Sequence, residues 1–142
     1  MWDQVREAPF QIVLRTVTQM SDAVVVDLGP ALDPQTRHVL GAADQVLVVG
    51  RADPVGLARL VRALHDLGSV RPVAPAPPVV VINQLRPTSV WGERVVRDAV
   101  EQLAGVRPDV FVPAEVASGS PFVAAISTIL EHVSPVGAHA AR

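Results

Sequence analysis

Asp27 is the side chain whose place in the sequence points most directly to chemistry. It ends the apolar run 23–26 and is followed by Leu28-Gly29-Pro30. A carboxylate at the carboxyl end of a buried strand can hold Mg²⁺, as it does in many nucleotide-binding proteins. The same carboxylate could instead cap the turn, because aspartate before Gly and Pro is common turn chemistry. Both interpretations stay open, and Gly29 could correspondingly offer a backbone N–H to a phosphate or only make the turn.

The chain contains no lysine, since all 12 residues counted as Lys or Arg are arginine. The phosphate-binding loop G-x-x-x-x-G-K-[ST] ends in a lysine that reaches the phosphates. Nothing before Asp27 has that form. The sequence therefore predicts one half of a nucleotide site, the metal-linked carboxylate, without the half that binds phosphate.

Other polar residues follow later apolar runs. The amide of Asn83 could contact a base edge with one donor and one acceptor, or serve only as a turn residue. Arg51 and Arg86 could meet phosphate or be solvated. In an open parallel sheet, ligands bind beyond the carboxyl ends of the strands. We therefore expect one edge to gather Asp27 and Gly29, Arg51 to Asp53, Asn83 to Arg86, and Pro113 with Glu115.

Alternating strand-like and helix-like segments must position these residues. Valine-rich runs predict strands at 23–27, 45–49, 79–82 and 109–112. They are continuous rather than alternating, which is typical of strands buried on both faces of a parallel sheet. Asp33-Pro34 and Asp53-Pro54 predict helix starts, with aspartate as the N-cap. The pattern predicts an α/β fold with a parallel sheet of about four strands and helices on both faces.

The helices expected between and around these strands follow from apolar spacing and from glycine. The helical segments are 10–20, 34–41, 54–68, 92–104 and one that begins at Ser120-Pro121. Gly68 is the expected end of the third of them, because glycine commonly terminates helices.

Composition limits the class of protein. With 142 residues, 49% of them apolar and 18% charged, we expect a single soluble domain, 1–142. It would comprise a leading helix at 1–22, a core at 23–133 and a frayed tail at 134–142. The absence of cysteine excludes disulfides, and a net charge of −2 gives no drive toward nucleic acid. No membrane anchor and no secretory signal is visible, so we expect a cytoplasmic protein.

The order of the segments resembles the MinD/ParA group of deviant-Walker P-loop ATPases. The resemblance covers roughly residues 21–133, which would be the carboxyl-terminal half of such a protein. The stretch "SDAVVVDLGPALDPQTRHVLGAADQVLVVGRADPVGLARL" resembles the family's Walker B strand, switch region, helix, next strand and following helix. "VVVINQLRP" resembles the strand whose terminal Asn contacts adenine, and "FVPAE" a later strand near the base. Within the group, "VVDLGPALDP" and "GVRPDVFVPAE" look most like the CpaE/TadZ-like branch.

The resemblance implies a function and a set of site residues. ATP and Mg²⁺ would be the cofactors, and ATP-driven dimerisation would position an apparatus for pilus assembly, secretion or septum-site determination. Asp27 would be the Walker B residue linked to Mg²⁺ through water, and Gly29 would belong to the switch. The adenine side would comprise Asn83, Arg86, Pro113 and Glu115. Because the phosphate loop is missing, we expect a truncated chain or a natural half-domain that is inactive alone.

Two further hypotheses stand beside this one. The chain could be a non-catalytic interaction module that associates with itself or with another protein through an unpaired sheet edge. It could also be an unrelated small α/β domain of the response-regulator kind. That fold requires a lysine near its phosphoacceptor aspartate, and the chain has none.

Overall fold

The computed structural model describes residues 7–29, 32–70, 76–86, 90–114 and 120–133. The chain divides into two compact units, Met1–Ala42 and Ala43–Arg142, and each is described by itself. The tail predicted at 134–142 lies outside the described residues.

The first unit contains two helices, α1 (Glu7–Met20) and α2 (Pro34–Ala42). Helix α2 begins as the sequence predicts, because the Thr36 N–H donates to Asp33 Oδ1 over 2.7 Å. Between the helices, the described part of 21–29 forms no strand.

The predicted strand at 23–27 is therefore wrong. Its valines are not buried either, and Val25 is 96% exposed. A valine-rich segment becomes a strand only when a neighbour completes its backbone hydrogen bonds. The described residues contain no strand that pairs with residues 23–27.

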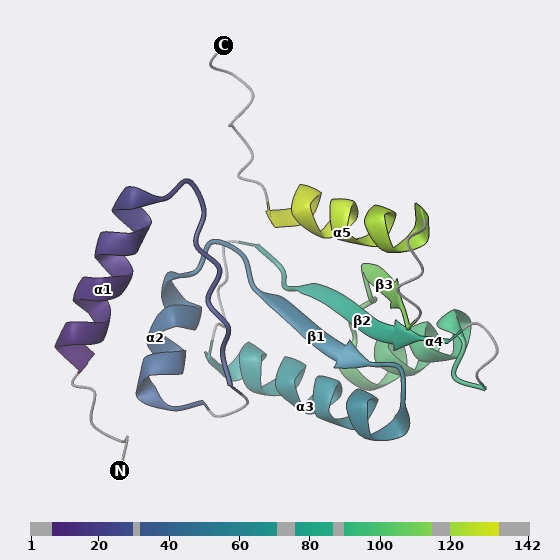
Figure 1. Cartoon of the computed structure of the whole chain (residues 1–142). Coiled ribbons are helices and arrows are strands. Elements are labelled where there is room, and N and C mark those ends of the chain that lie inside the picture. Colours follow the sequence, from purple (N-terminus) through teal and green to yellow (C-terminus); the bar gives the residue numbers. More distant parts are fainter. Residues whose placement is uncertain (1–6, 30–31, 71–75, 87–89, 115–119, 134–142) are drawn as a thin grey trace. The chain divides into compact units, whose positions relative to one another are not determined.

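The second unit is an α/β fold (Figure 1). Its elements are β1 (Leu47–Arg51), α3 (Pro54–Val70), β2 (Val79–Leu85), α4 (Glu93–Ala104), β3 (Val110–Pro113) and α5 (Ser120–Val133). The strands lie in the order β1-β2-β3 and both pairs are parallel. The predicted parallel sheet is confirmed, with three strands in place of about four.

Helices cover both faces of this sheet, as predicted. Helices α3 and α4 lie on one face and α5 lies on the other (Figure 1). The core on the α3–α4 side consists of Leu57, Leu60, Leu64, Val80, Ile82, Val96 and Val100. The core on the α5 side consists of Val79, Val81, Val110, Val112 and Ala125, with Phe122 and Ile129 packed against it. The central strand β2 contributes to both, which explains its uninterrupted apolar sequence.

Two glycines let α3 lie close to β1. A Cβ atom on Gly50 would come within 2.9 Å of the Leu60 side chain, and one on Gly56 within 2.7 Å of the Arg51 carbonyl oxygen. Gly68, in contrast, has no atom within 4 Å of such a Cβ, and α3 continues through it to Val70. The prediction that α3 ends at Gly68 is wrong, because nothing there requires the left-handed conformation that ends helices.

None of the helices in the described residues combines the length and the apolar character that a membrane crossing requires.

Candidate functional site at the carboxyl edge of the sheet

The three strands bring their terminal residues to one edge. Arg51 at the end of β1 is the register partner of Asn83 in β2, and Leu85 is the partner of Pro113 in β3. Parallel strands with right-handed connections place ligand sites at this edge in open α/β sheets. The expected grouping of Arg51, Asn83 and Pro113 is therefore present.

The backbone of β2 is irregular at this edge. The pairing with β3 shifts register between Ile82 and Leu85, and Gln84 has a φ of 60°. A residue other than glycine rarely adopts this left-handed conformation, which costs on the order of 1 kcal/mol. Asn83 supports it, because its Oδ1 accepts the Gln84 N–H over 2.8 Å. The amide oxygen of Asn83 is therefore engaged in local turn chemistry.

Arg51 and Asp53 form an ion pair at the start of α3. Arg51 Nη2 lies 2.7 Å from Asp53 Oδ2, while Asp53 Oδ1 accepts the Gly56 N–H over 2.8 Å. The hydrogen bond from Gly56 is the main reason that the pKa of Asp53 is lowered, and Arg51 adds to it. The predicted N-cap is confirmed.

These contacts determine whether the first turn of α3 could bind a phosphate group. Helix N-termini bind anions through free N–H groups. Here the carboxylate of Asp53 already accepts from the first turn of α3 and would repel an incoming anion. Asp33 does the same on α2, and hydrogen bonding from Thr36 lowers the pKa of Asp33. The residues present therefore do not fit the triphosphate of ATP at either helix start.

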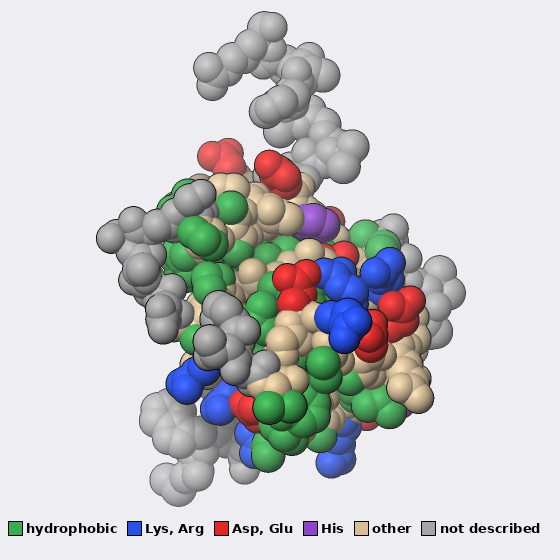
Figure 2. Space-filling view, turned by 90° about the vertical axis from the view of Figure 1, so that its right-hand side faces the viewer, with side chains coloured by type: hydrophobic (Ala, Val, Ile, Leu, Met, Phe, Trp, Pro, Cys, Tyr) green, Lys and Arg blue, Asp and Glu red, His purple; other side chains and the backbone are tan. Residues whose placement is uncertain are grey.

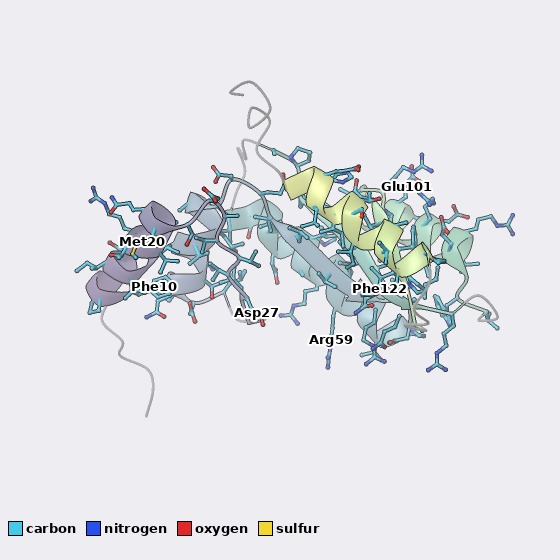
Figure 3. The ribbon with its side chains drawn as sticks, turned by 45° about the horizontal axis from the view of Figure 1, so that its top comes forward. Phe10, Met20, Asp27, Arg59, Glu101 and Phe122 are labelled. Carbon is cyan, nitrogen blue, oxygen red and sulfur yellow. The ribbon has the colours of Figure 1, made fainter. Side chains whose placement is uncertain are left out.

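The other predicted site residues lie in the first unit, just beyond β2 or outside the described residues. Asp27 and Gly29 belong to the first unit, where Asp27 lies on the exposed segment between α1 and α2 (Figure 3). A Cβ atom on Gly29 would have no neighbour within 4 Å, so packing does not require a glycine there. Arg86 is exposed just beyond β2. Glu115 lies outside the described residues.

Metal-ligating side chains do not cluster in the described ranges. No group of three or more His, Asp or Glu residues that could hold a metal ion occurs there.

Charged side chains of both signs are interspersed on the face shown in Figure 2. On α4, Arg97 pairs with Glu93 and stacks over the Phe111 ring, 4.9 Å from its centroid. Arg107 lies 3.4 Å from Glu101. The Arg59 side chain on α3 points away from the sheet into solvent (Figure 3). Arg97 and Arg107 are thus paired with acidic side chains on this solvated surface.

The sequence predicts an unpaired sheet edge without identifying its strand, and among the described residues the outer strands are β1 and β3. Strand β1 is at the edge of the sheet and exposes Leu47 by 36% and Val49 by 60%. The run 46–49 is as apolar as the central run 79–82. Composition alone could not distinguish an edge strand from a central one.

A scan against protein-family models and a search of curated proteins found no match to this chain.

Proposed function

We propose that this chain is a protein-interaction module in which an extended polypeptide segment adds to the open edge of β1. The observation that carries the proposal is the direction of the β1 backbone groups. The Val79 N–H donates to the Val46 carbonyl over 2.9 Å, and the Ala52 N–H donates to the Asn83 carbonyl over 3.0 Å. Along a parallel strand, alternate residues direct both backbone groups to the same neighbour. Those facing away from β2 are Leu47, Val49 and Arg51.

The two outer strands of the sheet differ in how they are protected. Strand β3 spans only four residues, ends in Pro113 and pairs with a register shift. Short length, proline and irregular pairing are ways in which proteins prevent strand addition. Strand β1 spans five residues in regular register and has no proline. Its one charged residue, Arg51, is held by Asp53.

The exposed side chains of β1 define what the added strand would bury. Leu47 and Val49 are register partners of Val79 and Val81, so they lie on the face that α5 covers at β2 and β3. An added strand with apolar side chains on that face would extend the α5-side core. Main-chain hydrogen bonds then supply affinity, and alternate side chains supply specificity.

Strand addition is tested with a probe peptide of alternating valine and threonine, flanked by arginines for solubility. In a titration followed by amide NMR, we expect the amides of Leu47, Val49 and Arg51 to shift most. Val49→Pro removes an outward N–H without removing a bond to β2, so binding should be lost while the fold persists. Val49→Thr keeps the N–H and should still bind. The proposal would be contradicted if the peptide shifted amides outside β1 instead of those of β1. It would also be contradicted if Val49→Pro bound the peptide as tightly as the unmodified chain.

A second candidate function is that of a cytoplasmic MinD/ParA-like ATPase domain that lacks the phosphate loop. It is supported by the resemblance of the segment order and by the shared edge of Arg51, Asn83 and Pro113. In an intact form such a domain would dimerise with ATP and position a pilus, secretion or division apparatus. We expect weak nucleotide binding at the first turn of α3, because the Asp53 carboxylate already accepts the Gly56 N–H there.

Calorimetric titration with Mg·ATP tests the second candidate. We expect no binding tighter than about millimolar, because free N–H groups at a phosphate cradle supply most anion affinity. Asp27→Asn is the matched variant. Tight binding that requires Mg²⁺ and is lost in Asp27→Asn would show a working nucleotide site.

A further inference from the structure

We propose that the strand added to β1 is β1 of a second copy of this chain, paired antiparallel about a two-fold axis at Val49. This inference rests on the proposed function of the β1 edge and names its partner. The two three-stranded sheets would then form one continuous sheet. A contact of this kind uses the same surface on both copies and closes at the dimer.

The backbone of β1 is self-complementary in this register. In an antiparallel pair, directly opposite residues that point toward each other exchange both of their hydrogen bonds. With Val49 opposite Val49 of the second copy, Leu47 lies opposite Arg51 and Arg51 lies opposite Leu47. All three outward-facing residues of each strand therefore meet an outward-facing residue. About six hydrogen bonds would form, which uses the outward-facing N–H and C=O groups of Leu47, Val49 and Arg51 in both strands.

The side chains are complementary in the same register. Val48 lies opposite Gly50 of the second copy, so a branched side chain meets a position that has none. Val49 meets Val49, which joins the most exposed apolar residues of the two edges. Leu47 lies beside the aliphatic stem of Arg51, and such stems pack against apolar surface while the charge stays in water.

The charges do not oppose this pairing. The two Arg51 residues lie at opposite ends of the new strand pair, four residue steps apart, or about 13 Å. That exceeds the screening length of about 8 Å at physiological ionic strength. Each Arg51 also remains paired with its own Asp53.

The contact is small, so the dimer should be weak. Five residues on each side bury less than the roughly 1,000 Å² that a stable interface needs. We expect a dissociation constant on the order of 10–100 μM, as for a transient contact. The dimer should therefore appear only as the protein concentration rises.

Sedimentation equilibrium on the full chain with paired charge variants tests the two-fold register. Val49→Lys and Val49→Asp each place like charges directly opposite one another across the axis, which is destabilising. We expect each variant alone to associate at least about tenfold more weakly, and an equimolar mixture of the two to associate again. Val90→Lys is the control, because Val90 is 87% exposed and lies outside the sheet. Circular dichroism checks that each variant is folded.

The outcomes separate this inference from the proposed function. A mixture that stays monomeric while the unmodified chain dimerises would overturn the two-fold register at Val49. An unmodified chain that is monomeric up to millimolar concentration but binds the probe peptide at β1 would overturn self-pairing and leave the strand-addition function intact. A chain that does neither would overturn both.

Discussion

Substitution of Gly56 by alanine tests the close packing of α3 on β1. A Cβ atom at this position would lie 2.6 Å from Arg51 Cβ, 2.7 Å from the Arg51 carbonyl oxygen and 3.0 Å from Arg51 Cα. These are atoms of the strand's last residue, and a rotamer change cannot move them. The substitution therefore has to push the first turn of α3 away from β1 and stretch the bond from Gly56 N–H to Asp53.

The expected magnitude follows from two opposing effects. Overpacking of a tightly packed site costs about 1–3 kcal/mol. Alanine stabilises a helix by up to about 1 kcal/mol relative to glycine. We therefore expect Gly56→Ala to lower the free energy of unfolding by up to about 2 kcal/mol. Gly68→Ala is the matched control on the same helix, because its Cβ would touch nothing. It should raise the free energy of unfolding by about 0.5–1 kcal/mol.

Urea denaturation measures both variants. In a Trp2→Phe background, Trp91 fluorescence reports on the core that α3 and α4 form, because Trp91 packs against it. The two alanine variants should shift the unfolding midpoint in opposite directions. If both variants stabilise the protein equally, α3 does not approach β1 as closely as described, and the account of Gly56 is wrong.

Three other changes probe the sheet and the cap. Asp109 Oδ2 accepts the buried Val80 N–H over 2.7 Å, so Asp109→Ala should cost about 1–3 kcal/mol in urea unfolding, while Asp109→Asn keeps an acceptor and should cost less. Ile82 is fully buried in the central strand, so Ile82→Ala should cost about 2–5 kcal/mol, and a smaller loss would mean a looser core. Because the pKa of Asp53 is lowered from its ordinary 3.8, its charge stabilises the fold above that pH, and this contribution is lost as pH falls through the folded value. The stability difference between the unmodified chain and Asp53→Asn, in which asparagine retains the cap, should therefore be constant near neutral pH and vanish in acid, and a pH-independent difference would contradict this origin.

Local signals in the sequence predicted the helices, apart from the end of α3, and three of the strands. Asp33 and Asp53 cap α2 and α3 because an aspartate oxygen reaches the first-turn N–H groups whatever the rest of the chain does. Gly105, which was not among the predicted helix ends, ends α4 in the left-handed conformation with a φ of 69°. Such features depend on a few neighbouring residues, and the sequence contains all of them.

The candidate site was harder to predict because it depends on distant partners. The runs 23–26 and 46–49 are both rich in valine, yet only the second is a strand, because only it pairs with β2. Propensity describes how a side chain suits a pleated surface, not whether a neighbour is present. The metal-linked role expected for Asp27 presupposed a buried strand, so it has lost its structural support here and stays a prediction from the resemblance.

The central place of β2 has a consequence for the folding kinetics. Both of its partners are reached through a helical crossover, so no two adjacent strands of this sheet are close in sequence. Non-local parallel pairing forms slowly, whereas helices such as α3 and α4 form within microseconds. Until the sheet closes, the run 79–82 is an uncharged, proline-free β-branched stretch exposed to other chains. The segment most deeply buried at the end of folding is therefore the one most prone to aggregate during it.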